Sequence, residues 1–146
     1  MEDIDREILR LLLGDGRMSY TDLGRATGLS TSAVHQRVRR LEQRGVIKGY
    51  TTVVDFEAIG LPLTAFVSVT PLDPAAPDDL PLRFAELPEI EACHSVAGSE
   101  NYILKVRVPT PGALEGLLAR IRAVASVSTR TTIVLSTPYE ARSLPT

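Results

Sequence analysis

The chain has 146 residues, of which 44% are apolar and 23% charged, and its formal net charge is −2. This apolar fraction excludes a disordered chain, and the length suits one ordinary domain or two small ones. No apolar run reaches the roughly 20 residues that a membrane-spanning helix needs. The charged start, MEDIDREILR, does not resemble a signal peptide, and a single cysteine excludes an internal disulfide. We therefore expect a cytoplasmic protein without a membrane partner.

Charge is distributed unevenly along the chain. Residues 1–54 carry nine Arg and Lys against seven Asp and Glu, whereas residues 55–146 carry seven against eleven. Five of the early cations fall within twelve residues and are opposed there only by Glu42: Arg37, Arg39, Arg40, Arg44 and Lys48. A basic patch of this kind favours nucleic-acid binding, although charge alone leaves a solvated helix face equally open.

Apolar residues recur at helical spacing in three short segments near the start of the chain. The predicted helices, each with the residue expected to cap it, are 4–13 (Asp3), 20–26 (Ser19) and 31–44 (Ser30). Gly28 and Gly45 stand where the following turns require a positive φ. The side chains expected inside this bundle are Ile4, Ile8, Leu11, Leu12, Leu23, Ala26, Val34, Val38 and Leu41.

A short helix, a tight turn and a second helix form a helix-turn-helix, in which the second helix reaches base edges. With its apolar stripe buried, the predicted helix 31–44 presents Thr31, Ser32, Ala33, Gln36, Arg37 and Arg40 on its opposite face. Gln pairs with adenine, Arg with guanine, and Ala contacts the thymine methyl group. Arg39, Arg44 and Lys48 suit phosphate contacts. The alternative is a three-helix bundle that does not bind DNA.

The rest of the chain alternates between strand and helix patterns. Residues 46–54 predict a linker strand that completes a first domain, 1–54, and residues 55–62 predict a hinge. The expected elements of the second domain, 63–137, are strand 63–72, helix 78–87, strands 90–97 and 101–108, helix 112–125 and strand 128–136; a tail, 138–146, follows. This order predicts an α+β chain in which a ferredoxin-like βαββαβ domain follows the helix-turn-helix.

A four-stranded sheet of this type has helices on one face, so its other face stays bare unless a partner covers it. Alternation along the strands assigns Phe66, Ile103 and Ile133 to that bare face. We therefore expect at least a homodimer, built through the sheet.

Catalytic chemistry finds little support in the sequence. Cys93 and His94 are neighbours on one predicted strand and point to opposite faces, so they cannot form a dyad, and the same reasoning separates Glu91 from His94 as metal ligands. Gly98 lacks the glycine spacing of a phosphate-binding loop. We predict no catalytic residue, no metal and no cofactor.

The sequence resembles the Lrp/AsnC family, the leucine-responsive or feast/famine regulators, and most closely their actinobacterial members. The resemblance lies in the segments IDREILRLLLGDGRMSYTDLGRATGLSTSAVHQRVRRLEQRGVIKGYTTVVD, CHSVAGSENYILKVRVPT and STRTTIVLST, which together span nearly the whole chain. It implies a winged-type DNA-binding domain, a linker strand, an effector-sensing and oligomerisation domain, dimers, and tetramers of dimers.

The same resemblance implies an effector-sensing domain, and we place its small amino-acid effector between the sensing domains of neighbouring dimers, at the loop Ala97, Gly98, Ser99, Glu100, Asn101 and Tyr102. Family members often carry two acids in this loop, but here Asn101 replaces one of them and only Glu100 remains to bind an ammonium group. Ile133 and Leu135 are expected to shape the side-chain pocket. The departure at Asn101 leaves the identity of the effector open, and the alternative is a turn that only stabilises the sheet.

These observations predict a sequence-specific transcriptional regulator that binds double-stranded DNA and is modulated by an amino-acid effector. Two alternatives stay open. One is a DNA-compacting architectural protein without effector control, and the other is an amino-acid-sensing subunit of an enzyme.

Overall fold

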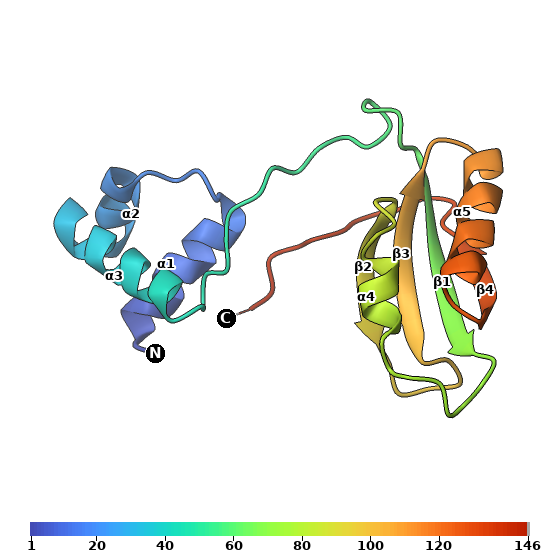
Figure 1. Cartoon of the computed structure of the whole chain (residues 1–146). Helices are drawn as coiled ribbons and strands as arrows, with labels where there is room; N and C mark the ends of the chain where they lie inside the picture. The colour runs from blue at the N-terminus through green and yellow to red at the C-terminus, as the bar shows by residue number, and fades with distance from the viewer. Residues whose placement is uncertain (146) are drawn as a thin grey trace. The chain divides into compact units, whose positions relative to one another are not determined.

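The computed structural model describes residues 1–145, which form two compact units (Figure 1). The head unit comprises Met1–Val53 together with the C-terminal residues from Tyr139, and the sheet unit comprises Val54–Pro138. The C-terminal residues join the head unit by a contact in which the Ser143 hydroxyl donates to the Leu13 carbonyl over 3.2 Å. Thr146, the last residue of the predicted tail, lies outside the described residues.

Three helices make up the head unit: α1 (Asp3–Gly14), α2 (Tyr20–Thr27) and α3 (Thr31–Gln43). The two predicted serine caps are confirmed, because Ser19 Oγ accepts from the Asp22 N–H at 3.0 Å and Ser30 Oγ accepts from the Ala33 N–H at 3.2 Å. The cap of α1 is Glu2 and not the predicted Asp3, which lies one residue inside the helix.

The core of the head unit is small. Its buried side chains are Ile8, Leu23, Val34, Val38 and Leu41. The prediction that Ala26 is buried is wrong, because that residue is exposed and Gly24 takes the inward position on α2. A Cβ atom added to Gly24 would lie 2.6 Å from the Leu29 carbonyl oxygen, so only glycine lets α2 approach the turn before α3 this closely.

The predicted strand 46–54 is absent from the described residues. Residues 44–47 form turns, and residues 48–55 have neither helical nor strand structure. A strand exists only when its N–H and C=O groups pair with those of a neighbour, so β-branched composition alone did not suffice here.

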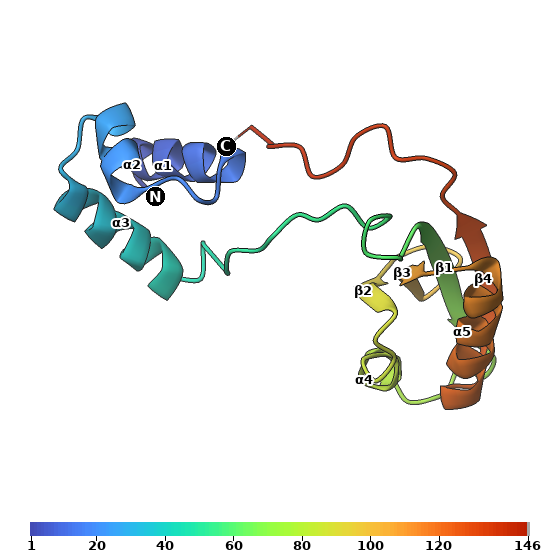
Figure 2. The same cartoon turned by 90° about the horizontal axis from the view of Figure 1, so that it is seen from above.

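Six elements form the sheet unit: β1 (Leu63–Pro71), α4 (Leu80–Phe84), β2 (Ile90–Ser95), β3 (Tyr102–Val108), α5 (Pro111–Val124) and β4 (Val127–Ile133). The strand order is β2-β3-β1-β4 with antiparallel pairing throughout, which is the expected βαββαβ topology. Both helices lie on the same side of the sheet (Figure 2). Helix α4 is shorter than the predicted 78–87, since it begins at Leu80 and ends at Phe84.

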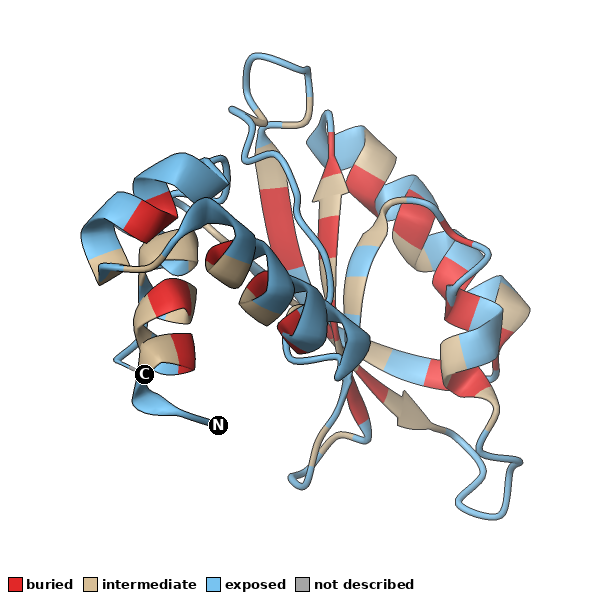
Figure 3. Cartoon of the chain, turned by 90° about the vertical axis from the view of Figure 1, so that its left-hand side faces the viewer, coloured by how far each residue is buried: buried red, intermediate tan, exposed pale blue. Residues whose placement is uncertain are grey.

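Buried residues line the side of α5 that faces the sheet and alternate along the central strands (Figure 3). Phe84, Val67, Leu104 and Ile121 are all fully buried there. Phe66 and Ile103 point to the opposite, helix-free face, as predicted. Ile133 does not, because it pairs with Ala65, and cross-strand partners project to the same side of a sheet. The prediction of Ile133 on the bare face is therefore wrong.

The predicted hinge, 55–62, begins with a turn over residues 56–60 that is fastened to the sheet unit. The guanidinium carbon of Arg107 lies 3.6 Å from the centre of the Phe56 ring. The same guanidinium donates to Glu91 at 2.7 Å and to the Thr64 hydroxyl at 2.9 Å. A cation–π contact thus holds this end of the hinge on β3.

Candidate DNA-binding helix and effector cavity

Most of the predicted DNA-contacting side chains lie on the exposed surface of α3 or just after it. Those exposed are Thr31, Ser32, Gln36, Arg39, Arg40, Arg44 and Lys48, and Ala33 is half-buried. They share one accessible surface because Val34, Val38 and Leu41 turn the opposite side of α3 into the core. Four of these exposed predicted contacts are cations and none is a carboxylate. Such a surface suits binding to the phosphate backbone of DNA.

Arg37 is the exception on α3. Its two terminal nitrogens each donate over 2.9 Å, one to Asp5 and one to Glu2, and its side chain is only 20% exposed. Burial alone would raise the pKa of Asp5, but the Arg37 hydrogen bond and charge outweigh this and leave it below its usual value. Arg37 therefore links α3 to the start of α1.

Two tyrosine contacts adjoin α3 that the sequence patterns did not indicate. The Tyr50 hydroxyl donates to Glu42 over 2.9 Å, and burial together with this bond raises the Tyr50 pKa to about 12. The rings of Tyr20 and His35 lie 5.1 Å apart. Tyr50 thus ties the segment after α3 to the last turn of that helix.

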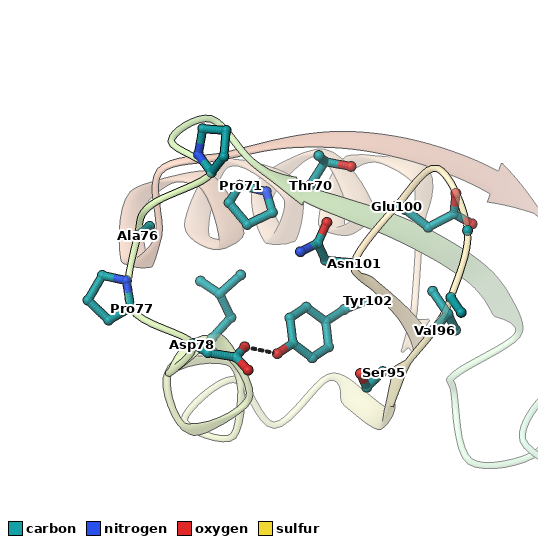
Figure 4. Close-up of a pocket in the computed structure, with 14 residues that line it drawn as sticks. Thr70, Pro71, Ala76, Pro77, Asp78, Ser95, Val96, Glu100, Asn101 and Tyr102 are labelled. Atoms are coloured by element: carbon teal, nitrogen blue, oxygen red, sulfur yellow. Dashed lines mark hydrogen bonds between the residues drawn. The ribbon is translucent and has the colours of Figure 1, made fainter.

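A cavity of about 540 Å³ opens at the end of the sheet where β1 finishes and β2 turns into β3 (Figure 4). The loop beneath it is closed by two backbone bonds: the Asn101 N–H donates to Val69 at 3.0 Å, and the Val96 N–H donates to Asn101 at 3.1 Å. The predicted effector residues that line the cavity are Ala97, Gly98, Glu100, Asn101 and Tyr102.

The loop between β1 and α4 forms the other wall of this cavity, and sequence reasoning missed it. Its lining residues are Pro71, Pro74, Ala76, Pro77, Asp78 and Leu80. The signal in the sequence was the concentration of Pro and Asp over residues 73–81, which was interpreted only as the approach to a helix. Proline fixes its own φ, so three prolines restrict the backbone of this wall at their own positions.

Tyr102 and Asp78 meet across the cavity. The tyrosine is 6% exposed, and its hydroxyl donates to the Asp78 carboxylate. This hydrogen bond, with burial and the aspartate charge, raises the pKa of Tyr102 to about 12, so the hydroxyl remains a donor at neutral pH.

Glu100 borders a second, smaller hollow as well as the first. The Ser99 hydroxyl donates to its carboxylate over 2.7 Å and lowers its pKa; the positive charge of Arg130 lowers it further. The second hollow measures about 210 Å³, and Ser68, Thr70, Ser99, Ser128, Thr129 and Arg130 complete its lining. Ser99 contacts this hollow and not the larger cavity.

Ile133 and Leu135 do not line either cavity. Thr129 pairs with Val69 beside the loop, whereas Ile133 pairs with Ala65 four residues further along β4. At about 3.3 Å per residue this separation is roughly 13 Å. Leu135 follows the end of β4 and is 96% exposed. Within one chain, these two side chains therefore lie apart from the cavity around Tyr102, and their role in a pocket between neighbouring dimers stays a prediction.

Other functional chemistry is not favoured by the part of the chain that the structure describes. Within residues 1–145, no three His, Cys, Asp or Glu side chains converge as metal ligands. None of the described helices combines the length and apolar character needed to cross a membrane. Cys93 pairs with Leu104 and His94 with Ile103, which confirms that these two neighbours face opposite sides of the sheet.

Comparison with known proteins matches both units. A winged helix-turn-helix DNA-binding family matches residues 1–48, and the Lrp/AsnC ligand binding domain family matches residues 64–144. The HTH-type transcriptional regulator LrpA of Mycobacterium tuberculosis is 53% identical over 142 residues, which cover 97% of this chain and 95% of that protein. The leucine-responsive regulatory protein of Escherichia coli is 39% identical over 140 residues, covering 92% and 85% respectively.

Solved structures agree with these matches. The crystal structure of M. tuberculosis LrpA has a TM-score of 0.91 at 51% identity and covers 100% of both chains. A feast or famine regulatory protein from M. tuberculosis, complexed with L-methionine, has a TM-score of 0.97 at 52% identity and covers 99% of both chains. The curated relatives are transcriptional regulators and not enzymes. The chain therefore belongs to the Lrp/AsnC family, and it is a transcriptional regulator with a helix-turn-helix DNA-binding domain and an amino-acid-binding domain.

Proposed function

We propose that α3 reads double-stranded DNA and that an amino acid in the 540 Å³ cavity modulates DNA binding or assembly. The observation that carries the proposal is the joint presence, in one chain, of an exposed cationic recognition surface and of a ligand-sized cavity on the family's sensing loop. A ligand that prefers one assembly over another shifts the equilibrium between them, and with it the placement of the DNA-binding helices.

The recognition surface divides by chemistry. Gln36 and Arg40 lie on exposed turns of α3 and suit base contacts, with Thr31, Ser32 and Ala33 at its N-terminus close to the groove floor. The remaining cations, Arg39, Arg44 and Lys48, suit the phosphate backbone. Arg37 stabilises the position of this surface, because its ion pairs with Asp5 and Glu2 link α3 to the start of α1.

The effector is a small amino acid. The 52%-identical regulator from M. tuberculosis was solved in complex with L-methionine, which makes methionine the first ligand to test here. Asn101 and Tyr102 lie on the cavity wall, and the backbone at Gly98 permits close approach of a ligand.

The working form is a homodimer that assembles further into tetramers of dimers. Phe66 is 37% exposed on the helix-free face of the sheet, beside the half-buried Ile103, and a second sheet packed there would remove this apolar surface from water. A symmetric pair would present two copies of α3 to half-sites spaced by whole turns of DNA. A regulator of this kind acts on the chromosome, in the cytoplasm.

Footprinting on the DNA upstream of the chain's own gene, with and without methionine, tests this function. Spaced, protected half-sites whose pattern changes with the amino acid support a regulator. Uniform protection that ignores the amino acid supports the architectural alternative, and absence of protection here together with no gel shift of unrelated DNA rejects DNA binding. Arg40→Ala should remove the protected half-sites, and Arg83→Ala is its matched control, because Arg83 lies in the sheet unit and pairs with Asp79.

A further inference from the structure

We infer that Asp78, and not the predicted Glu100, is the carboxylate that receives the ammonium group of the amino-acid effector. The inference rests on the proposed function, because it assigns a role within the effector cavity. It concerns a residue of the loop between β1 and α4 that neither the sequence patterns nor the resemblance pointed to.

The position of Asp78 carries the first part of the argument. Its Oδ1 accepts the hydroxyl of Tyr102, and among the described residues no donor occupies Oδ2. The neighbouring acid, Asp79, turns away and binds Arg83 at 3.0 Å. Figure 4 shows the Asp78 carboxylate directed at the Tyr102 hydroxyl, with Asn101 above them in the same cavity. Asp78 is thus a fixed carboxylate with one oxygen left for a ligand.

Glu100 borders both hollows, but its carboxylate is already hydrogen-bonded on the side of the smaller one. Its carboxylate holds the Ser99 hydroxyl at 2.7 Å and lies near Arg130 and Ser68, which belong to the smaller hollow on the helix-free face. In Figure 4 the Glu100 side chain extends away from Tyr102. A ligand that contacts Tyr102 therefore lies closer to the carboxylate of Asp78 than to that of Glu100.

The remaining walls define the class of ligand. Pro71, Pro77 and Leu80 offer apolar surface, and the Asn101 side-chain amide can donate to a carboxylate. The ammonium group would bind Asp78 by a charge-assisted hydrogen bond. This combination accepts α-amino acids, and it disfavours the matching 2-hydroxy acids because they lack the cationic group.

Calorimetric titration of the full chain tests the assignment with two probes, L-methionine and its 2-hydroxy analogue. The variants are Asp78→Asn, which keeps an oxygen for the Tyr102 hydroxyl but removes the charge, and Glu100→Gln as the matched control. Asp78→Asn should weaken methionine binding by at least about tenfold and leave the affinity for the hydroxy analogue unchanged. Glu100→Gln should change both affinities by less than about twofold.

Two results would overturn the inference: methionine binding by Asp78→Asn as tight as that of the unmodified chain, or a loss of discrimination between the two probes in Glu100→Gln. A thermal midpoint in the absence of ligand shows that each variant is folded. If the unmodified chain binds none of the twenty amino acids while still footprinting DNA, the effector part of the proposed function fails, and the role of Asp78 fails with it.

Discussion

The two units of this chain are stabilised in different ways. The core of the head unit has five buried apolar side chains, and this unit relies on serine caps and on the ion pairs of Arg37, whereas the core of the sheet unit has fifteen buried apolar residues. A small core contributes little free energy of unfolding, so each polar contact supplies a larger share of the stability of a small unit than of a large one. The comparison implies that replacing a single polar side chain should destabilise the head unit. Truncating a buried apolar side chain should destabilise the sheet unit.

The largest effect is expected from Phe84→Ala in the sheet unit. Phe84 is fully buried between α4 and the sheet, and removing its ring should lower the free energy of unfolding by about 3–5 kcal/mol. Hydrogen exchange measured by mass spectrometry resolves the two units. Faster exchange in β1 and β3 with unchanged exchange in α3 would support independent units, and equal acceleration in both would refute that independence.

Gly24→Ala should have the next largest effect, this time in the head unit. The new Cβ would lie 2.6 Å from the Leu29 carbonyl oxygen, so α2 must shift, at a cost of about 1–3 kcal/mol. Gly116→Ala is the control, because Gly116 lies in α5 with no atom within 4 Å of its added Cβ. The control should stabilise the chain by about 0.5–1 kcal/mol. Two destabilising substitutions of similar size would contradict the close approach at Gly24.

Arg37→Ala and Arg40→Ala should separate stability from DNA binding. Arg37 donates to two carboxylates of the head unit, so its loss should lower the stability of that unit more than the loss of Arg40 does. Arg40 is exposed, and its loss should leave stability within about 0.5 kcal/mol while weakening DNA binding by about 1–3 kcal/mol. Chemical denaturation and gel-shift titration measure the two quantities. A fully stable Arg37→Ala variant with altered base preference would restore Arg37 as a base-reading residue.

The smallest effect concerns acid stability. The pKa of Asp5 in the folded head unit lies below its usual value of 3.8, since the hydrogen bond and charge of Arg37 outweigh the effect of burial. The stability that Asp5 contributes is therefore complete above that value and is lost as the pH falls through the lower, folded pKa. Unfolding free energies measured from pH 7 to pH 3 should decline less steeply in Asp5→Asn. An identical decline in both proteins would show that the ion pair adds nothing.

Local patterns in the sequence predicted the head unit well, because its determinants are close together in the chain. Ser19 and Ser30 bind N–H groups three residues ahead, and Val34, Val38 and Leu41 repeat at helical spacing. Arg37 escaped this reasoning, since its partners lie 32 and 35 residues away. A helical pattern shows which side chains leave the core but not which of them meet another helix.

For the sheet unit, the sequence predicted the order of helices and strands, but it did not predict which residues pair across neighbouring strands. Strand order followed from the βαββαβ pattern, whereas the pairing of Ile133 with Ala65 depends on contacts between distant segments, and a shift of one residue moves a side chain to the other face. The cavity required a loop, 72–79, whose path no periodicity describes. The contact between Asp78 and Tyr102 therefore could not be predicted from the sequence, because it depends on the path of that loop.

The strand order β2-β3-β1-β4 also determines when each strand can pair as the chain is translated. Strand β1 lies in the middle of the sheet, yet both of its neighbours, β3 and β4, are translated after it. The core of the head unit needs no residue beyond Ile47, so α3 can fold while β1 still lacks both of its neighbouring strands. A growing chain thus completes the core that supports α3 before the cavity beside Tyr102 exists.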